Sequence, residues 1–184
     1  MPFSTRQGVS AQTRFLCRSR RPRWAWEALN VPKWGYSVGW VDPDRTAKAS
    51  LREARISHKH AREICKAIKG MMLEDAKKFL EDVIAKRQPV PFRRFCKKIP
   101  HRRGLRGWPA GRYPVKAARH ILRLLKDVEA NAEFKGLNVE KLKIIHAAAY
   151  PGTKIKKFFP RAFGRATPNF ETLTHVEVVV EEVG

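Results

Sequence analysis

Acidic residues are absent from three long segments of this 184-residue chain, and these segments hold most of its Lys and Arg. Residues 1–26 carry six Arg, residues 83–126 carry 14 Lys and Arg, and residues 141–170 carry seven more. The formal net charge of +22 is therefore concentrated where no acid lies nearby in the sequence. Cations at this density repel one another, so they oppose compaction and favour a polyanionic partner.

Two other features of the composition limit the class of protein. Apolar residues with regular spacing lie mainly at 48–85, 115–133 and 142–181, so the core comes from about half of a single domain, and we expect modest stability. No run of 18 apolar residues occurs, so we expect no membrane span. The N-terminal segment also has the composition of a transit peptide, but its Pro, Gly and clustered Arg favour an extended RNA-binding arm.

Three helices are predicted from apolar residues that recur at intervals of three and four. The first follows Ser57, a suitable N-cap residue, and ends near Gly70. The second carries two acids in its first turn, where the helix dipole favours them, and is ended by Pro89 and Pro91. The third starts at Pro114, a good first-turn residue, and ends before Gly136.

Strands are predicted in three places. Residues 142–150 are apolar, and residues 174–181 alternate Val with polar residues, the pattern of a half-buried antiparallel strand. Residues 48–56 show a weaker alternation that suggests an edge strand. The aromatic residues at 24–47 lie among Pro and Gly, which indicates a loop, and they either anchor a partner or cover the core.

The 23 residues at 151–173, between the two C-terminal strands, are too many for an ordinary loop. If Tyr150 pairs with Thr174, the pairing is centred on Ala162. Nearby Gly164 can adopt the positive φ that a tight turn requires. We therefore predict one long β-hairpin, in which each arm adds about 11 residues, or about 36 Å. Such a hairpin is marginal alone, and its basic residues indicate that its support is negatively charged.

Residues 86–113 are predicted to form an irregular basic loop, because Pro and Gly interrupt them repeatedly. Basic residues alternate there with aromatic ones. Arg pairs with phosphate oxygens and stacks on bases, and aromatic rings stack on unpaired bases. The pattern indicates phosphate binding, and we expect residues 1–30 and 86–113 to be disordered without a partner.

RNA is favoured over DNA as the partner, because no helix-turn-helix, zinc finger or basic zipper is evident, whereas an arm, a loop and a hairpin suit an irregular folded surface. A free-standing architectural DNA-binding protein or RNA chaperone remains the alternative. On the third helix, the two basic candidates also fit a simple solvated face. The candidate RNA-binding residues are Arg14, Arg18, Arg20, Arg21, Arg23, Arg93, Arg94, Lys97, Lys98, His101, Arg102, Arg103, Arg106, Trp108, Arg112, Tyr113, Lys116, Arg119, Lys154, Lys156, Lys157, Arg161 and Arg165.

Metal binding and catalysis lack a supporting pattern. His58 and His60 are two positions apart, so on a helix they point in different directions and do not share an ion. Cys65 falls on an apolar helix face and is expected in the core, while Cys96 and His101 lack further ligands at zinc spacing. Three irregularly spaced cysteines favour a reducing compartment. We expect no cofactor, no metal and no enzymatic activity; a nuclease that uses its surface carboxylates is the third alternative.

Long motifs from about residue 34 onward closely resemble one family, the large-subunit ribosomal proteins numbered twenty-two in the universal scheme and seventeen in the eukaryotic count. The resemblance covers about 150 residues, and the basic segment 86–113 looks like the insertion of the archaeal and eukaryotic branch. Residues 1–33 depart from the family pattern. The motifs are TAKAS (46–50), RISHKHAREICKAIKG (55–70), VPFRRF (90–95), HRRGLRGWPAGRYPVKAA (101–118), EANAEFKGL (129–137), IIHAAAY (144–150) and PRAFGRATP (160–168).

This resemblance implies an α+β fold, with three helices packed on a three-stranded antiparallel sheet and one greatly extended β-hairpin. It implies a ribosomal domain at 34–184, with the insertion at 86–113 and the hairpin at 151–173, whereas the basic, aromatic-containing arm at 1–33 is inferred from its own composition and not from the family. The implied partners are large-subunit ribosomal RNA, neighbouring ribosomal proteins and the nascent polypeptide, in the cytoplasm, with no membrane and no homo-oligomer. The hairpin tip at the exit tunnel would consist of Arg161, Ala162, Phe163, Gly164 and Arg165.

Overall fold

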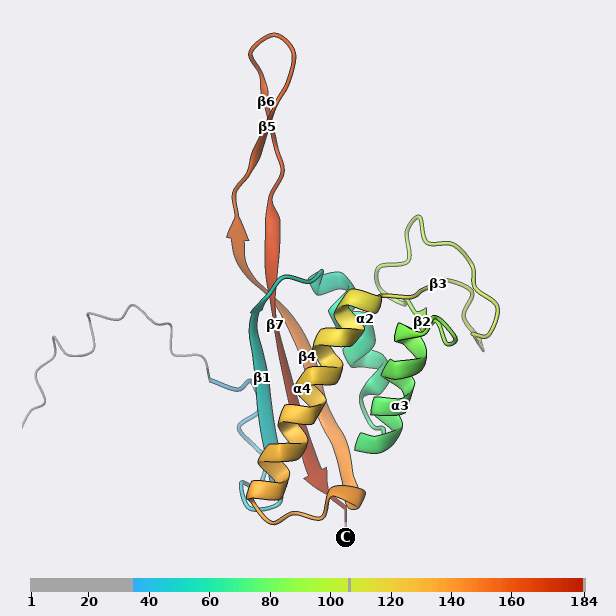
Figure 1. Cartoon of the computed structure of the whole chain (residues 1–184), viewed down its shortest axis with the longest axis vertical. Helices are drawn as coiled ribbons and strands as arrows, with labels where there is room; N and C mark the ends of the chain where they lie inside the picture. The colour runs from blue at the N-terminus through green and yellow to red at the C-terminus, as the bar shows by residue number, and fades with distance from the viewer. Residues whose placement is uncertain (1–34, 106, 184) are drawn as a thin grey trace, which may run out of the picture. The chain divides into compact units, whose positions relative to one another are not determined.

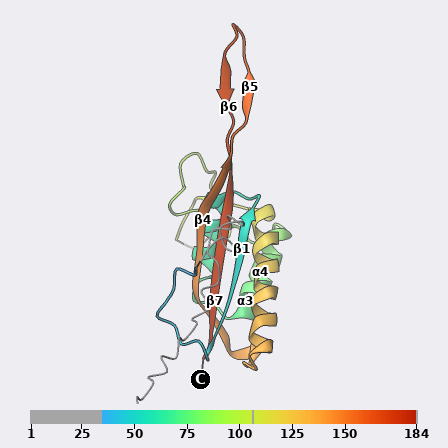
Figure 2. The ribbon, with the colours of Figure 1, turned by 90° about the vertical axis from the view of Figure 1, so that its left-hand side faces the viewer.

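The computed structural model describes residues 35–105 and 107–183, and from Tyr36 onward the chain is one compact unit. In that unit, three helices lie on one face of a three-stranded antiparallel sheet (Figures 1 and 2), so the predicted α+β class is confirmed. The elements are β1 (Thr46–Ala54), α2 (His58–Ile68), α3 (Leu73–Ile84), β2 (Val90–Pro91), β3 (Gly111–Arg112), α4 (Val115–Phe134), the short 3-10 helix η1 (Val139–Lys141), β4 (Leu142–Ile155), β5 (Phe158–Pro160), β6 (Ala166–Pro168) and β7 (Glu171–Glu182).

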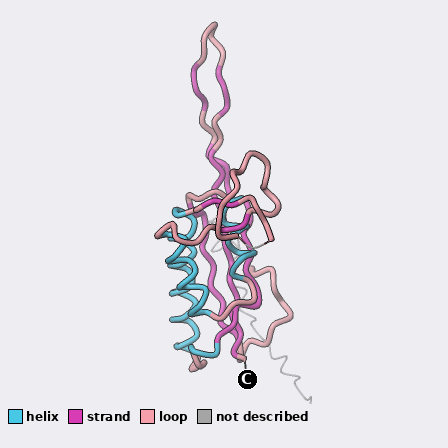
Figure 3. The backbone as a smooth tube through the Cα atoms, turned by 90° about the vertical axis from the view of Figure 1, so that its right-hand side faces the viewer, coloured by secondary structure: helices cyan, strands magenta, loops and turns pink. Residues whose placement is uncertain are grey.

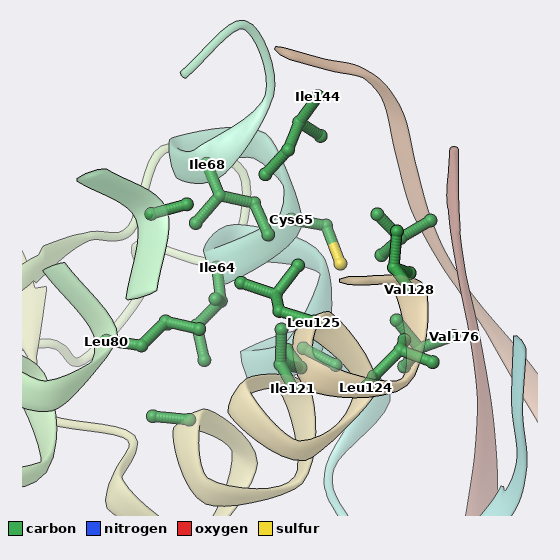
Figure 4. Close-up of a cluster of buried hydrophobic side chains, with 14 of the residues drawn as sticks. Ile64, Cys65, Ile68, Leu80, Ile121, Leu124, Leu125, Val128, Ile144 and Val176 are labelled. Atoms are coloured by element: carbon green, nitrogen blue, oxygen red, sulfur yellow. The ribbon is translucent and has the colours of Figure 1, made fainter. Parts of the chain in front are cut away.

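The core forms between the helices and the sheet. Helix α2 buries Ala61, Ile64, Cys65 and Ile68, the residues whose spacing predicted one helical face. Aliphatic side chains of α4 and β7 complete the cluster (Figure 4). The strand order β1-β7-β4 makes β7 the central strand of the sheet. Cys65 is a core residue, as predicted, and its burial raises the pKa of its thiol to about 12. Ser57 occupies the N-cap position of α2, but its side chain makes no capping hydrogen bond.

Helix α3 ends earlier than the sequence suggested. Lys86 follows the helix with a positive φ of 61°, and the N–H of Arg87 donates to the carbonyl of Asp82 at 2.9 Å, which is a Schellman termination. The prediction that Pro89 ends α3 is wrong, because the chain has already turned at Lys86. The same motif ends α4, where Gly136 takes the position predicted for it, with a φ of 75°.

The second face of the sheet is covered by residues 36–41, which precede β1 (Figures 2 and 3). Val38 and Val41 pack there against Val179 of β7. Strand β7 is therefore buried on both faces over 174–180, whereas its alternating pattern predicted a half-buried strand. The sequence did not reveal the covering segment, because its Gly residues indicated only a loop. Trp40 in this segment is 79% exposed, so valines rather than this ring cover the sheet.

Glu177 lies on this second face and accepts hydrogen bonds from three side chains. The Ser37 hydroxyl, the Tyr150 hydroxyl at 3.0 Å and the His146 ring nitrogen at 3.1 Å all contact one carboxylate oxygen, and the backbone N–H of Ser37 donates to the other at 3.2 Å. Burial raises the pKa of Glu177, but these bonds outweigh it and hold the pKa below its ordinary value. The cluster thus ties the segment before β1 to β4 and β7.

Strands β4 and β7 continue past the sheet as a hairpin, which β5 and β6 carry toward its tip (Figure 1). Pro160 pairs with Ala166, so the turn is centred one residue later than the predicted Ala162. The difference arises from two register shifts, at 144–146 and 151–154, each of which adds one extra residue to β4. The sequence calculation assumed pairing without bulges. Each extra residue in β4 moves the centre of the pairing by half a residue, so the two together move it by one residue.

The turn at the tip places two consecutive residues at positive φ. The N–H of Arg165 donates to the carbonyl of Ala162 at 3.4 Å, and Phe163 and Gly164 between them have φ of 57° and 64°. Positive φ at both central positions is the mark of a type I′ turn. Gly164 adopts this backbone without strain, whereas Phe163 has a Cβ and does so at a cost. The Phe163 side chain is 93% exposed, so the turn presents a large ring to the surroundings.

Candidate nucleic-acid interface

The basic segment 86–113 is folded against α2, in contrast to the disorder that we expected. Glu63 of α2 is only 2% exposed. Its carboxylate accepts the backbone N–H groups of Arg93, Arg94 and Phe95 at 3.0, 3.2 and 3.4 Å. Because a buried carboxylate satisfies three consecutive backbone donors, contacts within the chain itself hold this part of the segment against α2.

The aromatic residues of this segment are used partly in its own structure. Phe92 is 1% exposed and packs edge-on against the His60 ring, with 5.4 Å between centroids, so it cannot stack on a base. The half-buried Trp108 donates its ring N–H to the carbonyl of Phe92 at 2.8 Å. Tyr113 is also half-buried and lies 5.5 Å from the guanidinium of Arg102. Of the aromatic residues predicted to stack, Phe92 is thus excluded, and Trp108 and Tyr113 offer only part of their surface.

The predicted basic side chains lie on the surface in three regions of the described chain: the segment 86–113, the start of α4, and the hairpin. Arg14, Arg18, Arg20, Arg21, Arg23 and Arg106 lie outside the described residues. The exposed candidates are Arg93, Arg94, Lys97, Lys98, His101, Arg102, Arg103, Arg112, Lys116, Arg119, Lys154, Lys156, Lys157, Arg161 and Arg165.

These cations have few acidic neighbours in the described part of the chain. Lys157 pairs with Glu171 at 3.3 Å, and no other predicted cation there has a carboxylate within 4.0 Å. Arg112 donates instead to the carbonyl of Lys98 at 3.3 Å. The positive charge is therefore left to attract an external anion.

The hairpin has two different faces, as the alternation of a β-ribbon requires. Phe158 and Phe170 share one face, because their rings contact each other with 5.7 Å between centroids. Lys157 and Glu171 share the other face, because they form an ion pair. Continued through the pairing, the first face carries Lys154, Lys156, Pro160, Ala166 and Pro168, and the second carries Phe159, Arg161, Arg165, Thr167 and Asn169. Both faces of the ribbon therefore offer cations together with aromatic rings, and Arg161 and Arg165 lie on the same face near the tip.

The base of the hairpin is fixed by one carboxylate. Glu171 accepts from the Nε and Nη2 atoms of Arg55 at 2.6 and 2.8 Å, and from Lys157 at 3.3 Å. The hydrogen bond from Arg55 is the main cause that lowers the pKa of Glu171 from 4.5 to about 2. Arg55 lies between β1 and α2, so this contact joins the hairpin to the helical side of the domain.

This pairing predicts a pH dependence of the hairpin base. Because the folded pKa of Glu171 is lower than the unfolded one, its contribution is complete above about pH 4.5 and is lost as the pH falls through about 2. In Arg55→Gln, we expect the pKa of Glu171 to rise toward 4.5, measured from the side-chain carboxyl resonance by NMR. Arg123→Gln, which changes an exposed cation on α4, should leave it unchanged. A Glu171 carboxyl that titrates near 4.5 in the intact chain would contradict the pairing.

Two cations of α2 belong to this surface although the sequence did not single them out. The charged groups of Lys59 and Arg62 lie 5.6 and 5.8 Å from the centroid of the Phe95 ring, and Arg94 adds a third at 5.8 Å. The sequence could have indicated these two cations, because the motif at 55–70 has many basic residues and a single acid, Glu63. That acid faces inward, so the outer side of α2 is uniformly basic.

Other kinds of site find no support in the described residues. No group of three or more His, Cys, Asp and Glu side chains there is placed to hold a metal ion. Within the same residues, no helix has both the length and the apolar character needed to cross a membrane. Burial is the main cause that lowers the pKa of both His58 and His60, so these rings are neutral at pH 7.

Comparison with known proteins gives a consistent answer. Residues 49–181 match the family model described as ribosomal protein L22p/L17e. A protein of Methanocaldococcus jannaschii named large ribosomal subunit protein uL22 is 61% identical over 142 residues, which cover 77% of this chain and 91% of the relative. Proteins of the same name from Ignicoccus hospitalis and Methanopyrus kandleri are 56% and 58% identical, over 83% and 81% of this chain and 99% and 96% of their own lengths.

Proposed function

The chain belongs to the ribosomal protein L22p/L17e family, and from this premise we propose that it is a structural constituent of the large ribosomal subunit that binds and stabilises folded ribosomal RNA. Family membership confirms the resemblance found in the sequence, and the archaeal relatives support the archaeal type. The protein then acts in the cytoplasmic ribosome, with an architectural role and no catalysis. Its partners are ribosomal RNA and neighbouring ribosomal proteins, and it is present as a single copy.

The hairpin is the observation that carries this proposal. Residues 153–170 are all exposed, so this part of the ribbon contributes nothing to the buried core. Two-stranded ribbons of this kind are marginal in water unless another surface supports them. The cations of the hairpin and the absence of acids from 141–170 favour a polyanion as that surface, and in a ribosomal subunit the polyanion is RNA.

We further propose, from the family resemblance, that residues 161–165 reach the wall of the nascent-peptide exit tunnel. Arg161 and Arg165 lie on the same face of the ribbon, on either side of the turn, and would contact RNA phosphates there. The exposed ring of Phe163 is the group placed to meet either a base or the emerging polypeptide. Residues 161–165 would thus contact both ribosomal RNA and the nascent polypeptide.

Replacing residues 153–171 with Asn-Gly tests the proposal, because no core residue lies in that range and Asn-Gly favours a two-residue turn. We expect the urea midpoint to stay close to that of the intact chain, because the replacement removes only the outer ends of β4 and β7 and the largely solvent-exposed Arg55–Glu171 ion pair. We expect co-sedimentation with large ribosomal subunits at moderate salt to fall about tenfold or more, because several phosphate contacts are lost.

Two outcomes would contradict the proposal. If the shortened chain lost its folded core, the hairpin would be part of the scaffold rather than a docking element. If the intact chain migrated free of subunits or with DNA, the alternative of a free-standing architectural DNA-binding protein or RNA chaperone would be favoured.

A further inference from the structure

A pocket lies between the first turn of α2 and the basic segment 86–113, apart from the hairpin. Its volume is about 380 Å³, within the range of sites that take small ligands. Phe92, Phe95 and Ile99 form its apolar lining. Phe92 is almost fully buried and Phe95 is half-buried, so the apolar lining runs from the surface down to the core.

The remaining lining of this pocket is strongly cationic. Lys59, Arg94, Lys97 and Arg112 contribute to it, and no Asp or Glu does. Glu63 is close in sequence to Lys59, but its carboxylate is engaged with backbone N–H groups and does not line the pocket. An occupant must therefore combine an apolar group with negative charge.

His60 adds a polar group without adding charge. Its ring also lines the pocket and packs edge-on against Phe92. Burial, followed by the nearby charge of Arg112, lowers the pKa of His60, so a neutral imidazole is present at pH 7. A neutral imidazole has one donor and one acceptor, which suits the edge of a nucleobase.

We propose that this pocket takes one unpaired nucleotide of the bound RNA, with the base against Phe95 and its phosphate among the cations. Aromatic rings stack on unpaired bases, and Arg and Lys bind the adjacent phosphates. The inference rests on the proposed function, since it names the part of the RNA that this segment reads. RNA is favoured over an acidic peptide because two more exposed cations lie close to the pocket residue Arg112, where they can meet further phosphates. Arg112 donates to the carbonyl of Lys98, and Arg102 lies 5.5 Å from the ring of Tyr113, the residue after Arg112.

Titration of the full chain with AMP tests the pocket directly, with ribose 5-phosphate and inorganic phosphate as controls without a base. We expect AMP to shift the NMR resonances of the His60 and Phe95 rings, and the two controls to leave the Phe95 ring unshifted. In Phe95→Leu, which keeps an apolar side chain but removes the ring face, AMP affinity should fall about tenfold. Phe159→Leu, on the hairpin, is the matched control and should leave AMP affinity unchanged.

A second comparison uses an RNA hairpin with a single-nucleotide bulge and the same hairpin fully paired. The intact chain should prefer the bulged RNA, and Phe95→Leu should lose that preference while it keeps its affinity for the paired RNA. Should Phe95→Leu fail to fold, Arg112→Gln replaces it, and it should weaken AMP binding while adenosine binding stays the same.

The outcomes separate the pocket from the proposed function. If AMP leaves the pocket resonances unmoved, or an acidic peptide shifts them and AMP does not, the nucleotide site is overturned even though salt-dependent RNA binding persists. If the chain binds neither AMP nor ribosomal RNA at low salt, the nucleotide site and the proposed function are both overturned.

Discussion

RNA binding by the purified chain should weaken by about four decades as the salt concentration rises from 50 to 200 mM. The exposed cations of the segment 86–113 and of the hairpin can contact about eight phosphates, and each contact releases condensed counterions. The logarithm of the affinity should then fall against the logarithm of the salt concentration with a slope of about −6 to −7. A filter-binding titration with a large-subunit RNA fragment measures this slope.

Two double variants with equal charge loss locate the contacts. Arg161→Gln with Arg165→Gln removes two cations from the hairpin, and the slope should become shallower by about 2. Lys78→Gln with Lys126→Gln removes two exposed cations from the helices, outside the predicted contact residues, and should leave the slope unchanged. Equal slopes for the two variants would mean that only net charge matters, and the proposed interface would be wrong.

Glu63→Gln is expected to have the largest effect on stability among the polar substitutions considered. The amide retains one acceptor oxygen, but its NH2 group faces backbone donors where a carboxylate oxygen accepted them. Leaving a buried N–H without its acceptor destabilises the fold by about 1–3 kcal/mol. Urea unfolding should show this loss, and hydrogen exchange should accelerate at the amides of Arg93, Arg94 and Phe95.

Glu81→Gln is the matched control, because Glu81 is an exposed acid on α3. Its effect on stability should stay within about 0.5 kcal/mol, as for most surface substitutions. Because the two substitutions remove the same charge, a difference between their free energies of unfolding measures the contribution of the buried Glu63 contact. Equal stability of the two variants, with slow exchange at residues 93–95 in both, would show that Glu63 does not hold the segment.

The elements with strong local patterns could be predicted from the sequence. The buried stripe of α2 and the glycine that follows α4 were found because spacing and turn chemistry act over a few residues. The exposed cations were also predictable, since a block without acids has no internal way to neutralise its charge. The turn of the hairpin was predicted within one residue of its position, because strand pairing is symmetric about a turn.

The features that the sequence did not reveal depend on contacts between distant residues. Glu63 looks like an ordinary surface acid on an amphipathic helix, and only the return of the chain at 93–95 makes it a buried acceptor. Likewise, Val38 covers β7 from a segment with no periodicity. The two bulges in β4 leave no local signature, and they shift every pairing beyond them.

The central position of β7 has a consequence for synthesis. Strands β1 and β4 both pair with β7, the last strand in the sequence, and among the described residues β1 pairs with no other strand. Sheets closed by such distant segments form slowly, because loop closure precedes the stabilising contacts. The newly made polypeptide therefore spends its elongation time with the apolar residues of β1 and β4 unpaired, and these strands are open to aggregation until β7 arrives.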